Sequence, residues 1–209
     1  MVSMARILDA GPALGEDDLL DRVTAAALDQ FADFGIRRST IDDVARRAGV
    51  SRVSVFRRVA TKQGLVEIVI AREIRRGMTE LDRAWERGQT LEERLVLGLS
   101  FGMRYVSDHP LFDRLLRSEP DFLLPLLTVD GAPVLALYRS LIADRLRAEI
   151  QAGRAAATDV KLAAEVIARL AISLLLTRQG AITLDDNDSV LALVRLVLEP
   201  MLRPSANGA

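Results

Sequence analysis

The chain of 209 residues has no cysteine and a single histidine, His109, and these two scarcities restrict its chemistry. Disulfides, thiol nucleophiles and zinc sites built from cysteine and histidine pairs are excluded, and a catalytic triad would depend on the one imidazole. The remaining residues offer no recognisable set of nucleophile, general base and oxyanion hole. The sequence therefore predicts a binding protein rather than an enzyme, with no metal site and no cofactor.

Long uncharged stretches are also missing. The longest segment without Asp, Glu, Lys or Arg covers nine residues, 95–103, whereas a helix that crosses a bilayer needs about 20. The first ten residues include Arg6 and Asp9 and lack the apolar core of a signal peptide. Together with the absence of cysteine, these features predict a cytoplasmic protein without a membrane partner.

Charge is balanced overall but not along the chain. The 28 basic and 29 acidic residues give a net charge of −1. Residues 37–76, however, hold eleven basic and four acidic residues, so this block carries +7 and the remainder carries −8. Such segregation is typical of a protein in which one region meets a polyanion, although a solvated helix face produces it as well.

The periodicity predicts an all-α fold, because apolar residues recur every three or four positions and no strand pattern is found. The first helix is expected to run from the acidic residues 16–18 to Gly35 and to bury Leu20, Val23, Ala27, Phe31 and Phe34. Longer helices are expected near 62–87, 91–108, 111–118, 121–152 with an irregular middle, 159–179 and 187–202, followed by a frayed tail at 203–209.

Two short helices between these have clear start and stop signals. Thr40 with Asp43 three residues later predicts an N-cap with a capping-box carboxylate, and Gly49 ends that helix. Ser51 then caps a second helix, and Thr61 caps the long helix that begins at Lys62. Two short helices joined by a few residues that include glycine are typical of a helix-turn-helix.

The second short helix has an outward face suited to DNA. If Val55 and Val59 face the core, Val53 and Arg57 point away from it, with Phe56 on one flank. An arginine forms bidentate hydrogen bonds with guanine O6 and N7 in the major groove, and a valine methyl contacts the thymine methyl. The free amides at the start of this helix, and of the helix from residue 62, suit phosphates.

The residues FADFG at 31–35, STIDDVARRAGVS at 39–51, VFR at 55–57 and KQGL at 62–65 resemble the N-terminal domain of the TetR/AcrR family of bacterial transcriptional regulators. The resemblance covers roughly residues 17 to 66 and rests on several parts at fixed spacing. It implies a three-helix DNA-binding domain over residues 1–61, ordered from about residue 16. It also implies an all-helical effector-binding and dimerisation domain over residues 62–209.

The resemblance also assigns DNA-binding roles. Thr40 and Lys62 would contact phosphates, and residues 52–57 would enter the major groove. The full set of candidates is Arg37, Thr40, Ser51, Arg52, Val53, Ser54, Phe56, Arg57 and Lys62. Three positions depart from the family pattern: Val53 replaces a frequent glycine, Phe56 the usual tyrosine, and Val59 the usual aromatic residue.

The C-terminal candidates are apolar and aromatic residues that, in the resembling family, line a cavity between the central helices. The expected effector-binding residues are Trp85, Phe101, Arg104, Tyr105, Phe112, Phe122, Leu123 and Leu127. Core packing is the ordinary role of the apolar and aromatic members, and a surface salt bridge is the ordinary role of Arg104. His109 precedes Pro110 at a predicted helix boundary and is expected to cap the helix or to face solvent.

The last two helices predict a homodimer, because their apolar residues cover more than one face and therefore need two partners. The expected interface residues are Val166, Leu170, Leu174, Val190, Val194 and Val197, with a well-buried core helix as the alternative. The sequence thus predicts a homodimeric, ligand-responsive regulator, a repressor that binds a pseudo-palindromic double-stranded DNA operator and is released by a small apolar effector. A non-specific DNA architectural protein and an all-helical enzyme remain alternatives.

Overall fold

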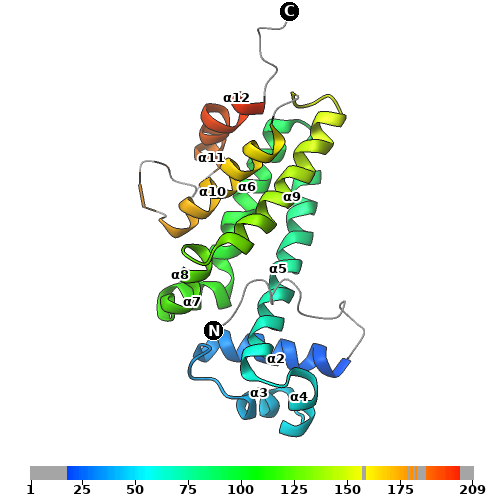
Figure 1. Ribbon diagram of the computed structural model, residues 1–209, viewed down its shortest axis with the longest axis vertical. Coiled ribbons are helices and arrows are strands. Elements are labelled where there is room, and N and C mark those ends of the chain that lie inside the picture. The colour runs from blue at the N-terminus through cyan, green and yellow to red at the C-terminus, as the bar shows by residue number, and fades with distance from the viewer. Residues whose placement is uncertain (1–17, 157–158, 178, 181, 183–186, 203–209) are drawn as a thin grey trace, which may run out of the picture. The chain divides into compact units, whose positions relative to one another are not determined.

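The computed structural model describes residues 18–156, 159–177, 179–180, 182 and 187–202, and every regular element in this part of the chain is a helix (Figure 1). The all-α prediction is confirmed. The elements are α2 (Asp18–Phe34), α3 (Ile41–Ala48), α4 (Arg52–Val59), α5 (Lys62–Glu86), α6 (Leu91–Asp108), α7 (Pro110–Ser118), α8 (Pro120–Leu127), α9 (Ala132–Gln151), α10 (Val160–Leu176), α11 (Asn187–Leu193), a π-helical segment (Val194–Leu198) and α12 (Glu199–Leu202).

The predicted irregularity within 121–152 is a break between two helices. α8 ends at Leu127, and α9 begins at Ala132 with a proline in its first turn. The predicted helix start at residue 16 and the predicted tail at 203–209 lie outside the described residues.

The chain divides into two compact units, each of which combines two stretches of sequence. Unit 1 holds the residues up to Gly77 and the segment Asp108–Gly131, and unit 2 holds Met78–Ser107 and the residues from Ala132 onward. α5 therefore belongs to both units, and α7 and α8 group with the N-terminal helices. The expected boundary between residues 61 and 62 divides the chain by DNA-binding and effector-binding function, whereas these two units are defined by contacts within the chain. The functional boundary therefore stays a prediction.

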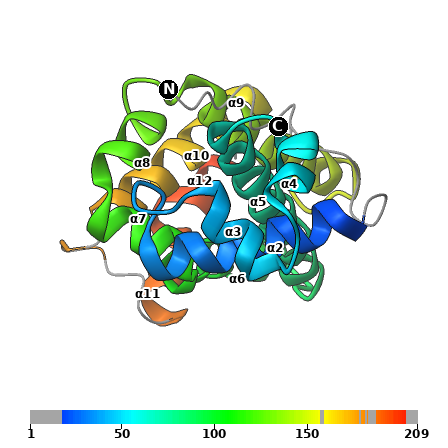
Figure 2. The same cartoon turned by 90° about the horizontal axis from the view of Figure 1, so that it is seen from below.

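The core of unit 1 is built from the apolar faces of α2 to α5. Val23 and Phe31 from α2, Val44 from α3, Val55 from α4 and Leu65 from α5 are all at most 1% exposed. Seen from below in Figure 2, α3 and α4 lie against α2. Residues of each of these three helices contact the other two. Burial of these faces stabilises α3 and α4 in particular, which have eight residues each and are too short to be stable alone.

One residue of the predicted buried face of α2 lies elsewhere. Phe34 is the last residue of the helix and is 52% exposed, so the expectation that it is buried is wrong. The helical period places it in line with Phe31, but the chain turns away directly after it at Gly35, whose φ is +82°. The buried stripe therefore ends at Phe31.

Gly35 is required both by its backbone conformation and by its neighbour. Its positive φ is strained for any residue with a Cβ, and an added Cβ would overlap the buried carboxylate of Glu119 at the α7–α8 corner. We expect Gly35→Ala to lower the free energy of unfolding by about 1 to 3 kcal/mol, measured by urea titration.

Gly102 supplies the matched control. It lies inside α6, and apart from its chain neighbours and the backbone of its own helix, no described atom lies within 4 Å of the Cβ that alanine would add. Gly102→Ala should therefore raise the free energy of unfolding by about 1 kcal/mol, the ordinary difference in helix propensity. Equal stability of the Gly35→Ala protein and the unsubstituted chain would contradict this explanation of the α2–α3 turn.

The core of unit 2 is formed by α6, α9, α10, α11 and the segments that follow α11. Its most buried side chains include Leu146, Ala164, Val190, Val194 and Leu198, each at most 1% exposed. α9 and α10 pack against each other along their length (Figure 1). This unit also buries one carboxylate, Glu149, which lies between two arginines.

Within the described part of the chain, no single helix is long and apolar enough to span a membrane. The bent pair α8 and α9 passes that test by length and composition alone.

Candidate nucleic-acid interface

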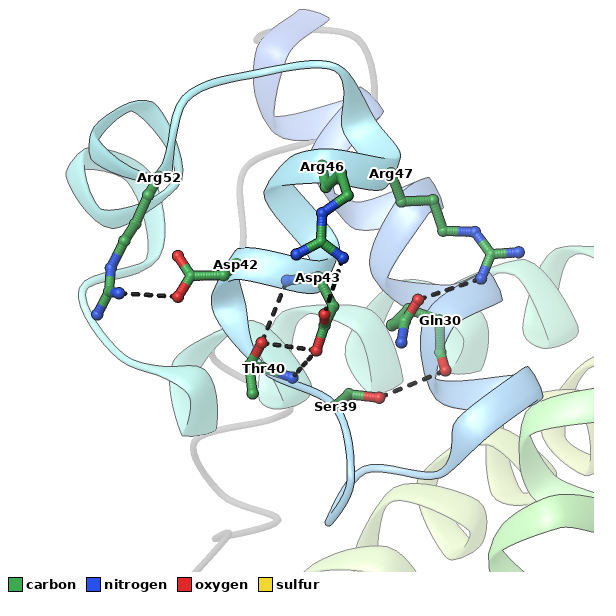
Figure 3. A network of polar contacts seen from close by, with 8 residues as sticks. All are labelled: Gln30, Ser39, Thr40, Asp42, Asp43, Arg46, Arg47 and Arg52. Atoms are coloured by element: carbon green, nitrogen blue, oxygen red, sulfur yellow. Dashed lines mark hydrogen bonds and ion pairs between the residues drawn. The ribbon is translucent and has the colours of Figure 1, made fainter.

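The first short helix of unit 1 begins and ends where the sequence predicts, and the second begins where it predicts. The Thr40 hydroxyl accepts a hydrogen bond from the Asp43 amide at 3.2 Å, and the Asp43 carboxylate accepts one from the Thr40 amide at 3.0 Å, which completes a capping box (Figure 3). The hydrogen bonds from the Thr40 side chain and backbone lower the pKa of Asp43 below its usual value. Gly49 ends α3 in the left-handed conformation, with φ +66°.

The start of α4 is fixed in the same way. Ser51 is its N-cap, and its hydroxyl accepts a hydrogen bond from the Ser54 amide at 3.1 Å. Val55 and Val59 are buried in the core of unit 1, whereas Val53 is 65% exposed and Arg57 is exposed. The orientation expected from the helical period is therefore confirmed, and α4 presents an outward face with apolar and basic side chains.

Arg52, the first residue of α4, is held by two neighbours. Its Nη1 donates a hydrogen bond to Oδ2 of Asp42 on α3 at 2.8 Å (Figure 3). Its guanidinium carbon also lies 5.1 Å from the centroid of the Phe56 ring, one turn further along α4. The phenylalanine that stands where the family usually has tyrosine is 37% exposed and supports this arginine.

Arg57 differs from Arg52 in that no other described residue holds its guanidinium by a hydrogen bond or an ion pair. It is exposed on the outward face of α4 and is free to follow a partner. Among the described residues, neighbours orient Arg52 on this face and none holds Arg57 by a hydrogen bond or an ion pair.

Two further candidates, Arg37 and Lys62, take part in contacts within unit 1. The Arg37 amide donates to the Glu119 carboxylate at 3.1 Å, and its guanidinium pairs with Asp121 at 3.2 Å. Lys62 Nζ donates to the Arg37 carbonyl oxygen at 3.2 Å. Arg37 and, through its carbonyl oxygen, Lys62 are thus linked to the corner between α7 and α8.

Sequence reasoning missed three acidic residues of this region: Asp42, Glu119 and Asp121. Asp42 lies in the first turn of α3, where acidic residues are common because they interact favourably with the helix dipole. Its presence there therefore does not indicate that it pairs with Arg52. Glu119 and Asp121 lie more than 80 residues from Arg37, a distance that no local pattern spans.

A shallow basic hollow lies beside the capped start of α3. It has a volume of about 460 Å³ and is lined by Gln30, Phe34, Arg38, Asp43, Arg46 and Arg47. Arg47 pairs with Asp33 at 2.6 Å, and Arg46 with Asp43 at 3.3 Å. Two of the three arginines that line the hollow are therefore paired with carboxylates of unit 1.

The effector candidates divide between the two units. In unit 2, Arg104 is exposed, and Trp85, Phe101 and Tyr105 are half-buried, with the Phe101 and Tyr105 ring centroids 5.5 Å apart. Trp85 packs against the core of that unit. In unit 1, Phe112 and Leu123 are buried, and Phe122 and Leu127 are half-buried.

Phe122 lines a second cavity of about 460 Å³, which lies entirely within unit 1. Its walls are Ile36, Val66, Phe122, Pro125 and Leu126, with Lys62, Gln63, Asp121 and Asp130 as polar members. Among the described residues, no three His, Asp or Glu side chains gather in a way that would hold a metal ion.

The expected dimer residues fall into two groups. Val190 and Val194 are fully buried in the core of unit 2, so the expectation that they contact a second subunit is wrong. Leu170 and Val197 are half-buried against that core, and Leu174 is half-buried. Val166 is 37% exposed, and it shares the surface of α10 with Leu162, which is 61% exposed.

His109 precedes α7 as its N-cap residue, but its side chain makes no capping hydrogen bond. Its imidazole is only 11% exposed, and Nε2 lies 2.9 Å from the buried carboxylate of Glu73 on α5. The expected solvent-facing role is therefore wrong, because an acidic partner and the Phe112 ring enclose the imidazole.

The capped helix pair, the outward face of α4 and the basic block define a helix-turn-helix DNA-binding protein. Residues 23–69 match the family model for bacterial regulatory proteins of the tetR family, so the resemblance predicted from the sequence is confirmed over this part of the chain. Solved structures share the fold across nearly the whole chain, whereas no curated protein sequence matches it.

Three of these structures illustrate the likeness. The TetR family repressor AlkX from a Dietzia species, implicated in biodegradation of n-alkanes, is 24% identical over 91% of this chain and 96% of its own, with a TM-score of 0.64. GusR from Salmonella enterica is 18% identical over 91% and 99%, with a TM-score of 0.62. The fatty acid degradation regulator FadR from Bacillus halodurans is 16% identical over 88% and 97%, with a TM-score of 0.59.

Proposed function

We propose that this transcription regulator is a homodimeric repressor that binds a pseudo-palindromic operator and is released by a small, largely apolar effector. The observation that carries the proposal is the outward face of α4, where Arg52, Val53 and Arg57 are exposed beyond a capped helix start. Two such helices related by a two-fold axis would read half-sites one or more turns of DNA apart.

Repeated selection of bound duplexes from a random-sequence pool tests the DNA-binding part of the proposal. The chain should enrich one inverted repeat, called the selected duplex below, and a footprint should show protection of both half-sites. Enrichment of no common sequence would contradict the proposal.

The dimer part of the proposal is supported by the apolar surface that unit 2 leaves exposed. Leu162 and Val166 on α10 are exposed, as is Leu196 in the π-helical segment at 80%. Leu162 and Val166 lie four residues apart and therefore on one face of α10, and an exposed apolar helix face favours an interface with a second copy.

We expect Val166→Glu to convert the dimer into a monomer, because the interface would then bury an unpaired carboxylate. The mass measured by analytical ultracentrifugation should halve, and affinity for the selected duplex should fall by about 100-fold or more, since the two half-sites no longer act together. Leu124→Glu, at a 40% exposed position on α8, is the matched control and should leave the mass unchanged. An unchanged mass for Val166→Glu would place the interface elsewhere.

The effector part of the proposal is supported by the cavity of unit 1 at Phe122. Its volume lies in the range of small-molecule sites, and its walls are mainly apolar. It also borders Lys62, whose Nζ contacts the Arg37 carbonyl, so an occupant would bias the position of two candidate DNA-binding residues. Release then requires only that the effector prefer the conformation that does not fit DNA.

Compounds that dissociate the selected duplex can be found by fluorescence anisotropy with a panel of small apolar molecules. For an active compound, Phe122→Ala should raise the concentration for half-release by about tenfold or more, because the ring supplies much of the apolar contact. Leu124→Ala, an exposed position on the same helix, should not change this concentration. Equal sensitivity of the two variants would exclude this cavity as the effector site.

A further inference from the structure

Asp42 is an acidic side chain next to the outward face of α4. Its side chain is 48% exposed, and its carboxylate accepts the hydrogen bond from Arg52 at 2.8 Å (Figure 3). Phosphates repel a carboxylate, so this residue weakens the binding of any DNA sequence. An exposed ion pair of this kind also contributes little to stability. The pairing with Arg52 therefore calls for an explanation other than affinity or stability.

Arg52 is restrained from two sides. Asp42 binds Nη1, and the guanidinium carbon lies 5.1 Å from the Phe56 ring centroid, within the range of a cation–π contact. A guanidinium has five N–H donors, and the hydrogen bond to Asp42 uses one of them. The remaining donors are sufficient for bidentate bonds to guanine O6 and N7 while the contact with Asp42 is kept.

We propose that Arg52 reads a guanine in the major groove and that Asp42 and Phe56 are the positioning residues that direct it to that base. The inference rests on the proposed operator binding, and it assigns a specificity-determining role that the family match does not contain.

The restraint explains how the arginine would distinguish a base from the DNA backbone. The Asp42 carboxylate repels a phosphate that approaches the remaining donors of Arg52, whereas the uncharged edge of a guanine can be bound beside it. Because Asp42 and Phe56 orient the Arg52 side chain before DNA binds, less side-chain entropy is lost on binding. Arg57, which no other described residue holds by a hydrogen bond or ion pair, has neither restraint.

The Phe56 ring also accounts for one departure from the family pattern. A tyrosine at this position would offer a hydroxyl to a phosphate, which phenylalanine lacks. The phenyl ring instead contacts the guanidinium of Arg52. With phenylalanine at this position, a contact with the DNA backbone is lost, and the side chain that reads the base is oriented.

The test measures the affinity of the full chain for the selected duplex, for versions with each guanine replaced, and for a random duplex of equal length. Arg52→Ala should lose about 5- to 100-fold on the selected duplex and become indifferent to one guanine per half-site. Arg52→Lys should recover binding to the random duplex but not the preference for that guanine, because lysine lacks the planar fork.

Asp42→Asn should act in the opposite direction on non-specific DNA. It should tighten binding to the random duplex by about threefold or more and steepen its salt dependence by about one unit of slope, because one guanidinium becomes available to phosphates. The preference for the guanine read by Arg52 should fall at the same time. Asp33→Asn, which breaks the Asp33–Arg47 pair by the same change of charge, is the matched control and should leave that preference unchanged.

The proposal is overturned if Asp42→Asn leaves the preference at every guanine within about twofold of the original, or if Arg52→Ala weakens selected and random duplexes equally. Failure of the unsubstituted chain to enrich any sequence would contradict the proposed function instead, so the two failures are distinguishable.

Discussion

Glu149→Ala should lower the free energy of unfolding of unit 2 by about 3 to 5 kcal/mol, because it removes one partner from a buried ionic cluster. The Glu149 side chain is 1% exposed and lies 2.6 Å from Arg94 Nη1 and 2.6 Å from Arg154 Nε. Alanine would leave the Arg94 guanidinium, itself only 20% exposed, without its carboxylate. Urea unfolding followed by circular dichroism measures the loss.

The same cluster predicts how stability depends on pH. Burial disfavours the charged form of Glu149, but hydrogen bonds and charge from Arg154 and Arg94 outweigh it and hold the pKa of Glu149 below its usual range. A lowered pKa in the folded state means that the stabilisation is present above the ordinary pKa of glutamate. It is lost as the pH falls through the lowered value. The difference between the two proteins should therefore shrink in acid.

Glu165→Ala is the matched control. Glu165 also lies between two arginines, Arg139 and Arg169, but its side chain is 28% exposed. Water can replace its lost contacts, so the loss of stability should be much smaller. Equal losses for Glu149→Ala and Glu165→Ala would show that burial of Glu149 is not what makes its cluster important.

Arg57→Ala and Lys62→Ala should weaken DNA binding in different ways. Arg57 lies on the outward face of α4, and its loss should cost about 1 to 3 kcal/mol on the selected duplex and relax one base position. Lys62 lies at the first turn of α5 and is expected to contact a phosphate. Its loss should weaken all sequences alike and flatten the salt dependence by about one unit of slope.

Anisotropy titrations of both variants at four salt concentrations separate these outcomes. Lys161→Ala, an exposed lysine on α10, is the control for removal of one positive charge far along the chain. Equal loss on selected and random duplexes for Arg57→Ala would refute its role as a base-reading residue.

Local signals in the sequence were sufficient to predict the helix-turn-helix. Thr40, Ser51 and Thr61 each cap the helix that follows, and each does so through contacts within four residues. The orientation of α4 followed from the burial of Val55 and Val59 at helical spacing.

Contacts between distant segments could not be predicted in this way. Arg37 binds Glu119, and Glu149 binds Arg94, and the residues of each pair lie more than 50 positions apart in the sequence. The sequence around a charged residue does not indicate which distant residue of opposite charge will pair with it. The broad apolar stripe that includes Val190 and Val194 did not show which of these residues the core of unit 2 would occupy.

The ratio of affinities for the selected and the random duplex, measured by competition at one fixed salt concentration, tests most directly whether α4 reads base sequence. Sequence-specific recognition by Arg52 and Arg57 predicts a ratio of about 1,000 or more. A ratio near one would contradict it and would identify the basic block as the surface of a non-specific DNA-binding protein.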